Sequence, residues 1–87
     1  MSKYTVEFAP AAARQLRKLS REAQLRITAI VDKLANNPFP QSFKKLTGQK
    51  DLYRVRVGDY RVVYQFNAGQ LVVLIVRVGH RRDIYDF

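Results

Sequence analysis

The sequence predicts an α+β domain in which a helical hairpin packs on a mostly antiparallel four-stranded sheet, in the order β-α-α-β-β-β. In the first half of the chain, apolar residues recur three or four positions apart, which is typical of helices that bury one face. In the second half, three apolar or alternating segments are joined by short connections, which is typical of antiparallel strands. With 87 residues, the chain suffices for one such domain, which we expect to span residues 1–87.

The first half contains one expected strand and two expected helices. Residues 4–8 alternate apolar and polar side chains, as a half-buried strand does, and Pro10 suits the first turn of a helix. Ser20 is a suitable N-cap for a second helix, which we expect to end at residues 36–38 because proline and the residue before it disfavour helix. The apolar positions of the two helices are Ala12, Ala13, Leu16 and Leu19, then Ala23, Ile27, Ile30, Val31 and Leu34.

The second half contains three expected strands after a loop over residues 39–50. Residues 52–57 and 60–66 form the first two, and the two-residue connection Gly58-Asp59 predicts a tight hairpin between them. Residues 71–78 are nearly all apolar, so we expect a central strand covered on both faces. A short polar tail follows.

Composition excludes several kinds of chemistry. The chain has no cysteine and one histidine, so we expect no disulfide, no thiol catalysis, no metal site and no cofactor. No paired carboxylates, glycine-rich phosphate loop or Ser-His-Asp order is evident. The longest apolar run, residues 71–76, is far shorter than the ~20 residues that span a bilayer. No signal peptide is visible at the start, and we expect a soluble cytoplasmic protein without a membrane partner.

The net charge of +9 indicates a polyanionic partner. From residue 51 onward every basic residue is arginine, whose planar fork grips a phosphate with two hydrogen bonds. A codon bias toward arginine would explain the same pattern without any function. The basic outer faces of the two helices are by default a solvated surface.

The expected hairpin gathers arginines on one face. A two-residue loop places Arg56 opposite Arg61, with Arg54 beside them on the same face, while the other face is apolar and belongs to the core. Like charges directly opposite each other destabilise a sheet. The pattern therefore favours a phosphate ligand that relieves the repulsion, although arginines splayed into water remain the alternative.

The tail adds further candidates. It follows the last strand, where a chain leaving the sheet is able to fold back over the open face. Arg81 or Arg82 would supply another phosphate contact, and Tyr85 would stack on a base or exchange a proton. His80 is the single histidine, the residue type most often used for proton transfer near neutral pH. Each also has a purely structural explanation, such as an apolar anchor for Tyr85 or a turn position for His80. An RNase without metal uses the 2′-hydroxyl of the RNA as nucleophile and needs cations around the phosphorane.

Four segments of the sequence resemble the RelE toxins of the RelE/ParE superfamily, and the resemblance covers nearly the whole chain in element order. The combination of the third of these segments with the fourth, at this spacing, is the specific part. They are Lys45-Leu46-Thr47-Gly48, Leu52-Tyr53-Arg54-Val55-Arg56-Val57, Asp59-Tyr60-Arg61-Val62-Val63-Tyr64 and Val78-Gly79-His80-Arg81-Arg82-Asp83-Ile84-Tyr85.

The resemblance implies a toxin of a type II toxin-antitoxin system with a RelE-like fold. Such a toxin is a ribosome-dependent endoribonuclease that enters the A site and cleaves the bound mRNA through 2′-hydroxyl attack, and a RelB-like antitoxin blocks it. Arg61 falls on the family's transition-state arginine, Arg81 on the arginine of the leaving group, and Tyr85 on the tyrosine that acts as base or stacks. The expected catalytic residues are thus Arg61, Arg81, Tyr85 and His80, and the expected RNA-binding residues are Arg54, Arg56, Lys45 and Arg82.

Several positions depart from the family pattern. Arg54 and Arg56 stand where lysine is frequent, which keeps the charge but makes an acid or base role there doubtful. Thr47 stands where some relatives carry another arginine, so one RNA contact is missing. His80 stands where some relatives have lysine and would share the acid role. Longer relatives have a C-terminal helix, in place of which we expect no more than a turn.

Two alternatives remain open. A ParE-like toxin has the same fold but binds and inhibits DNA gyrase without catalysis, and such chains generally lack the arginine and tyrosine set found here. A nucleic-acid-binding regulator would also carry a basic surface. In-frame cuts in translated messages would indicate a RelE-type toxin, whereas intact messages with broken DNA would indicate a ParE-type toxin.

Overall fold

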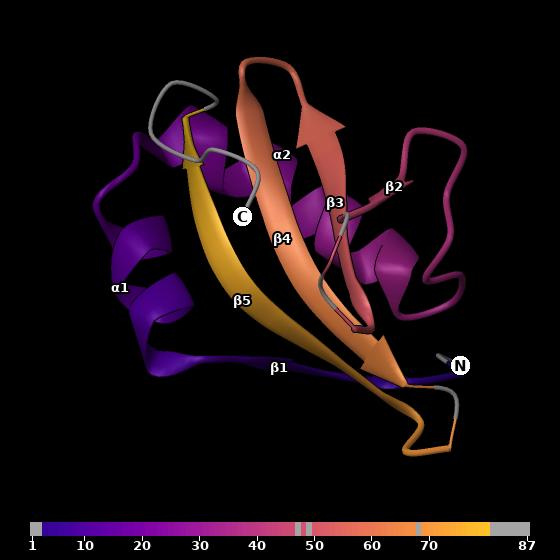
Figure 1. The fold of residues 1–87 in the computed structure, drawn as a ribbon. Helices are drawn as coiled ribbons and strands as arrows, with labels where there is room; N and C mark the ends of the chain where they lie inside the picture. Colours follow the sequence, from indigo (N-terminus) through magenta and orange to yellow (C-terminus); the bar gives the residue numbers. More distant parts are fainter. Residues whose placement is uncertain (1–2, 47, 49, 68, 81–87) are drawn as a thin grey trace.

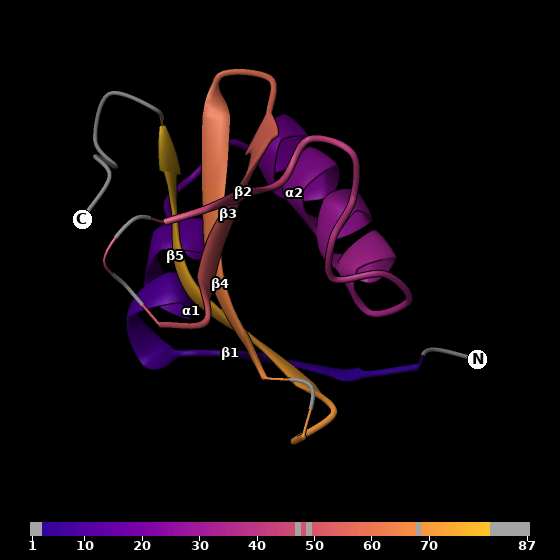
Figure 2. The same ribbon diagram turned by 45° about the vertical axis from the view of Figure 1, so that its right-hand side comes forward.

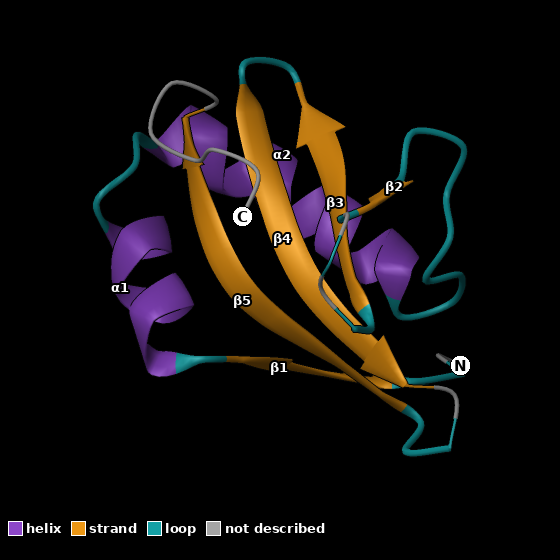
Figure 3. Ribbon diagram, viewed as in Figure 1, coloured by secondary structure: helices purple, strands orange, loops and turns teal. Residues whose placement is uncertain are grey.

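The structure, a computed structural model, describes residues 3–46, 48, 50–67 and 69–80. Two helices cover one side of a five-stranded sheet whose strand order is β1-β5-β4-β3-β2 (Figures 1 and 3). The elements in chain order are β1 (Thr5–Phe8), α1 (Pro10–Arg17), α2 (Arg21–Leu34), β2 (Lys44–Lys45), β3 (Leu52–Val57), β4 (Tyr60–Asn67) and β5 (Val72–His80). The α+β class expected from the sequence is confirmed.

The sheet has one strand more than the four that we expected. The additional strand is β2, whose two lysines pair with Tyr53 and Arg54 at one edge of the sheet. A strand of two residues is too short to show any hydrophobic period, so the sequence pattern does not reveal it. At the other edge β1 runs parallel to β5, whereas every other pairing is antiparallel.

Both helices bury their apolar faces against the same side of the sheet. Ala12 of α1 and Ile27 and Leu34 of α2 join one core cluster with residues of β3, β4 and β5. Figure 2 shows α2 along one side of the sheet. The Oγ of Ser20 accepts a hydrogen bond of 3.2 Å from the backbone N–H of Ala23, which confirms Ser20 as the N-cap of α2. We call this side of the sheet the helix side.

β5 is an interior strand of the sheet, as we expected, but it is not covered on both faces. β5 lies between β1 and β4, and its residues alternate between buried and half-buried up to Ile75. Leu71, which we had placed in this strand, lies before it with a positive φ of 57° and is 59% exposed. The long apolar run therefore reflects two separate clusters on the two sides of the sheet rather than a strand buried between two layers.

Aromatic rings anchor the loop that joins α2 to β2. The hydroxyl of Tyr64 donates a short hydrogen bond to the backbone carbonyl of Pro38, and the ring of Phe39 lies edge-on to Tyr53 and Phe66. Tyr64 is fully buried, and this burial, with a smaller contribution from Tyr53, raises the pKa of its phenol above the ordinary value. Tyr64 is therefore a protonated core residue that holds the loop in place.

Candidate functional site: an arginine face on the sheet

The β3–β4 hairpin has the register expected from its two-residue turn. Arg56 pairs with Arg61, and Arg54 pairs with Val63. Gly58 supplies a positive φ of 59° at the first turn position, which a residue with a β-carbon adopts only with strain. Because paired residues project to the same side of a sheet, the three arginines share the side that faces away from the helices. We call this side the arginine face.

Arg54 is buried and not splayed into water, since only 8% of its surface reaches solvent. The reason is a second apolar cluster on the arginine face, formed by the buried Leu46 and Val63 together with the half-buried Leu52 and Val76. A long arginine stem is able to lie along such an apolar floor. The Nη1 of Arg54 and the Nε of Arg61 are both removed from solvent, so part of each guanidinium is desolvated. Arg61 is half-buried, and Arg56 is exposed.

A β-bulge adds a fourth arginine that we did not select from the sequence. The β4–β5 register shifts between Val63 and Tyr64, so that Val63 pairs with Arg77 while Tyr64 pairs with Ile75. Val76 is the extra residue, and both Val76 and Arg77 lie on the arginine face. With strict alternation from Ile75, Arg77 would point into the core. The signal in the sequence was an arginine between two valines in an apolar strand, which a bulge reconciles with a buried Val78.

The two lysines of β2 lie on opposite sides of the sheet. Lys44 pairs with Arg54 and therefore belongs to the arginine face, whereas Lys45 pairs with Tyr53 on the helix side. The structure thus does not bring Lys45, which we had selected as an RNA-binding residue, to the three arginines. Its neighbour Lys44 takes that place.

His80 also lies away from the arginine face. It pairs with Tyr60 at the end of β5, and the two rings meet edge to face with centroids 5.6 Å apart. Tyr60 packs against the core cluster on the helix side. Gly79 is the residue of β5 that pairs with Arg61. Because side chains alternate along a strand, His80 points to the opposite side of the sheet.

The remaining candidates lie outside the described residues. They are Arg81, Arg82 and Tyr85 of the tail, together with Thr47, the position where a family arginine is replaced. Their roles stay predictions, and so does the expected turn at the end of the chain.

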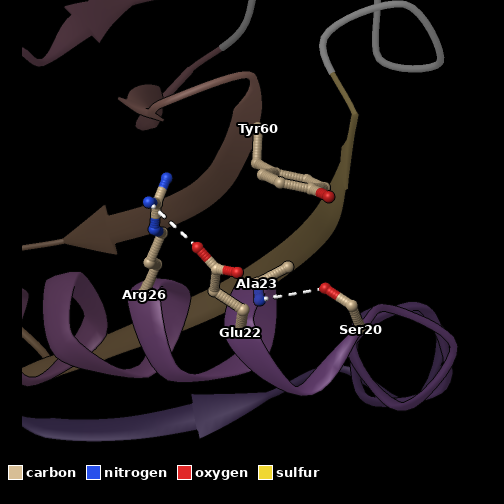
Figure 4. A pocket seen from close by; sticks show the side chains of 5 residues that line it. All are labelled: Ser20, Glu22, Ala23, Arg26 and Tyr60. Atoms are coloured by element: carbon tan, nitrogen blue, oxygen red, sulfur yellow. Dashed lines mark hydrogen bonds and ion pairs between the residues drawn. The ribbon is translucent and has the colours of Figure 1, made fainter.

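A small pocket of about 200 Å³ opens on the helix side, at the N-terminal end of α2 (Figure 4). Ser20, Glu22, Ala23, Arg26 and Tyr60 line it. Glu22 and Arg26 form an ion pair of 3.1 Å on its wall, and the volume is below the ~300 Å³ at which typical ligand pockets begin. This pocket contains none of the arginines of β3, β4 and β5, so we do not assign the function to it.

The described part of the chain contains no cluster of three or more His, Asp or Glu residues able to hold a metal ion. None of its helices has the length and apolar character needed to cross a membrane.

Comparisons with known proteins agree with this architecture. The family model described as the ParE toxin of the type II toxin-antitoxin system parDE matches residues 6–85. The chain belongs to the RelE/ParE family of type II toxins. Within this family it is a toxin of the RelE type, as its relatives by name and structure indicate.

Two curated relatives show the degree of likeness. A putative RelE-like toxin protein of Escherichia coli is 34% identical over 97% of the chain and 92% of its own length. The toxin RelE3 of Methanocaldococcus jannaschii is 31% identical over 94% of the chain and 96% of its own length.

Solved structures of family members superpose closely. The archaeal RelE–RelB complex of Pyrococcus horikoshii matches with a TM-score of 0.81 and 31% identity over 94% of the chain and 99% of the matched one. The isolated RelE toxin of E. coli matches with a TM-score of 0.78 and 26% identity over 88% of the chain and 83% of the matched one.

Proposed function

We propose that this type II toxin is a metal-independent endoribonuclease that cleaves messenger RNA in the ribosomal A site. The observation that carries the proposal is the direct opposition of Arg56 and Arg61 on the arginine face, with Arg54 in the adjacent row. Such a set of like charges costs stability in the free protein and becomes favourable once a phosphate is bound. The RelE-named relatives support the same activity.

The chemistry follows from the residues that surround the phosphate. The 2′-hydroxyl of the RNA attacks the adjacent phosphorus, the bond to the 5′-oxygen of the next nucleotide breaks, and a 2′,3′-cyclic phosphate remains. Arg61 is proposed to stabilise the additional negative charge of the phosphorane. The attraction between a preorganised cation and the phosphorane strengthens as this charge develops. Arg54 and Arg56 are proposed to bind the RNA backbone, since guanidinium groups hold their protons too tightly for acid–base catalysis.

The proton transfers are proposed for residues of the tail. Tyr85 would accept the proton of the 2′-hydroxyl or stack on the base, and Arg81 would stabilise the leaving oxygen. Arg82 would add a phosphate contact. The leaving 5′-oxygen is proposed to take its proton from water or from His80, although the His80 ring contacts Tyr60 on the helix side of the sheet.

We further propose that a RelB-like antitoxin with an acidic or amphipathic segment covers this basic surface. RelE relatives have been solved in complex with RelB from P. horikoshii and E. coli. The charge of +9 supplies the complementary electrostatics. Co-expression of the neighbouring gene followed by affinity purification of the toxin tests this: an acidic partner should co-purify, and a toxin that is always recovered alone would contradict it.

Mapping of RNA 5′ ends after brief expression of the toxin tests the cleavage. We expect new 5′ ends that respect the reading frame inside translated regions, and their loss in the Arg61→Ala variant. Purified ribosomes programmed with a short message should reproduce the cuts, whereas the free message should not be cut. The family model also carries a ParE description, so DNA integrity is measured in the same cells. Broken DNA with intact messages would replace the proposal by gyrase inhibition.

A further inference from the structure

The arginine face is wider than the β3–β4 hairpin. Its residues form two rows that run across the strands. One row contains Arg56 and Arg61 and ends at Gly79, which has no side chain. The second row extends over four strands and consists of Lys44 of β2, Arg54 of β3, Val63 of β4 and Arg77 of β5.

We propose that Lys44 and Arg77 bind backbone phosphates on either side of the scissile one, so that a single RNA strand lies across the sheet, roughly perpendicular to its strands. This inference rests on the proposed endoribonuclease function and adds two binding residues to it. Both side chains are exposed, and they stand at the two ends of the second row. Arg54 lies between them and next to the row of Arg61.

The dimensions of the sheet support this path for the RNA. Neighbouring strands lie about 4.8 Å apart, so the second row spans about 14 Å from β2 to β5. Nucleotides stacked in one strand advance by about 3.4 Å each, so a row of this length is able to contact more than one phosphate. A single phosphate held by Arg61 would reach neither end of the row.

The charges on this face have one sign along both rows. Besides the basic residues, the rows contain only Val63 and Gly79. Glu7 of the edge strand β1 also lies on this side of the sheet. It pairs with Leu74 of β5, one row beyond Arg54 and Arg77. The Val63 side chain belongs to the apolar cluster on the arginine face. It gives the bound RNA an apolar surface between the two basic ends of the row.

The bulge at Val76 is the structural device that makes this arrangement possible. It lets β5 contribute Val78 to the core and Arg77 to the arginine face, although a single valine separates Arg77 from Ile75. On the opposite edge, the pairing of β2 with β3 selects Lys44 over Lys45. Two neighbouring lysines with the same exposure therefore provide a matched pair for an experiment.

The test measures binding of a fluorescently labelled single-stranded RNA whose 2′-hydroxyls are all methylated and which therefore cannot be cleaved. Fluorescence anisotropy at a series of salt concentrations gives both the affinity and its salt dependence. Arg77→Gln and Lys44→Gln should each weaken binding by about tenfold at low salt and reduce the slope of log affinity against log salt by about one. Arg77→Lys should keep the slope, because it retains the charge.

The controls remove the same charge elsewhere. Lys45→Gln is the control for Lys44→Gln, and Arg14→Gln, an exposed position on α1, is the control for Arg77→Gln. Both controls should stay within about twofold of the unmodified protein, as expected for a charge that contacts no phosphate. Equal losses in a test variant and its control would overturn the inference.

Cleavage on programmed ribosomes separates this inference from the proposed function. Arg77→Gln should need about tenfold more toxin than the unmodified protein to reach the same cleavage rate, and Arg14→Gln should match the unmodified protein. Arg61→Ala should cleave far more slowly even at saturating toxin. A protein that binds the methylated RNA as expected but cuts no message would refute the endoribonuclease proposal and leave the two binding residues in place. If the protein cuts messages but Arg77→Gln and Lys44→Gln bind RNA as their controls do, the endoribonuclease proposal stands. The binding role of Lys44 and Arg77 is then refuted.

Discussion

Arg56 and Arg61 lie directly opposite each other across the β3–β4 ladder, on the side of the sheet that faces away from the helices. Two like charges in this position cost the free protein a few tenths of a kcal/mol. The hairpin turn at Gly58 fixes the register, so neither residue is able to slip to another partner. The repulsion is therefore built into the fold and is relieved when an anion binds between them.

Replacing Arg61 should separate activity from stability. Arg61→Ala creates no cavity on the helix side of the sheet, and it removes the repulsion with Arg56, so the free energy of unfolding should hold or rise by a few tenths of a kcal/mol. Cleavage on programmed ribosomes should fall by about two to three decades, because a cation placed at a developing phosphorane charge contributes roughly 3–4 kcal/mol. Single-turnover cleavage and a thermal melt of the same preparation measure the two effects.

Arg14→Ala is the control for this experiment, since it removes an exposed arginine from the outer surface of α1. It should change neither the melt nor the cleavage rate. Cleavage at the unmodified rate by a well-folded Arg61→Ala protein would end the assignment of the arginine face as the active site.

Tyr64 should matter for stability and not for catalysis. Its buried hydroxyl donates a hydrogen bond to the carbonyl of Pro38, and Tyr64→Phe leaves that carbonyl without its donor. The free energy of unfolding should fall by about 1–3 kcal/mol, as measured by chemical denaturation. Tyr53→Phe is the control, because Tyr53 is half-buried and its ring stacks on Tyr64 at a centroid distance of 5.7 Å. A loss equal to that of the control, or a loss of cleavage at full stability, would contradict this role.

Leu71 should be a position where glycine stabilises the protein. Its φ of 57° lies in the left-handed region, which costs a residue with a β-carbon about 1–2 kcal/mol, and 59% of its surface is exposed, so little burial is lost. The higher backbone entropy of unfolded glycine offsets about 0.5–1 kcal/mol of this. Leu71→Gly should therefore raise the free energy of unfolding by about 0.5 kcal/mol. Leu71→Ala removes the side chain beyond the β-carbon but keeps the backbone strain at the positive φ. An equal gain in this variant would show that the strain is not the cause.

The sequence sufficed for those features that depend on local pattern. The N-cap at Ser20 and the pairing of Arg56 with Arg61 follow from short motifs with a defined geometry, and both are found in the structure. The features that it did not reveal depend on contacts between distant segments. The bulge at Val76 arises only when β5 pairs with β4, and it turns Arg77 from a core position to the arginine face.

The candidate site shows the same division. The burial of Arg54 accompanies an apolar cluster that joins Leu46, next to the short strand β2, to Val63 of β4 and Val76 of β5. The separation of His80 from Arg61 depends on where β5 ends relative to β4. A motif states which residues are close in the chain, but the side of a sheet on which each of them lies depends on the register of its neighbours.

Tyr85, which lies outside the described residues, gives the sharpest test of the mechanism, because one substitution separates its two possible roles. Tyr85→Phe keeps the aromatic ring that would stack on a base and removes the hydroxyl that would move a proton. If Tyr85 acts as the general base, single-turnover cleavage on programmed ribosomes should fall by about two to four decades, whereas a purely stacking residue should tolerate phenylalanine with little change. A phenol close to positive charge ionises more readily, so the proposed base role predicts the larger loss. Tyr85→Ala removes both the ring and the hydroxyl. It should lower the cleavage rate and also raise the toxin concentration needed for half-maximal cleavage. A Tyr85→Phe protein that cleaves at the unmodified rate, beside a Tyr85→Ala protein that binds its ribosome complex less tightly, would assign Tyr85 to stacking and leave the base to another group.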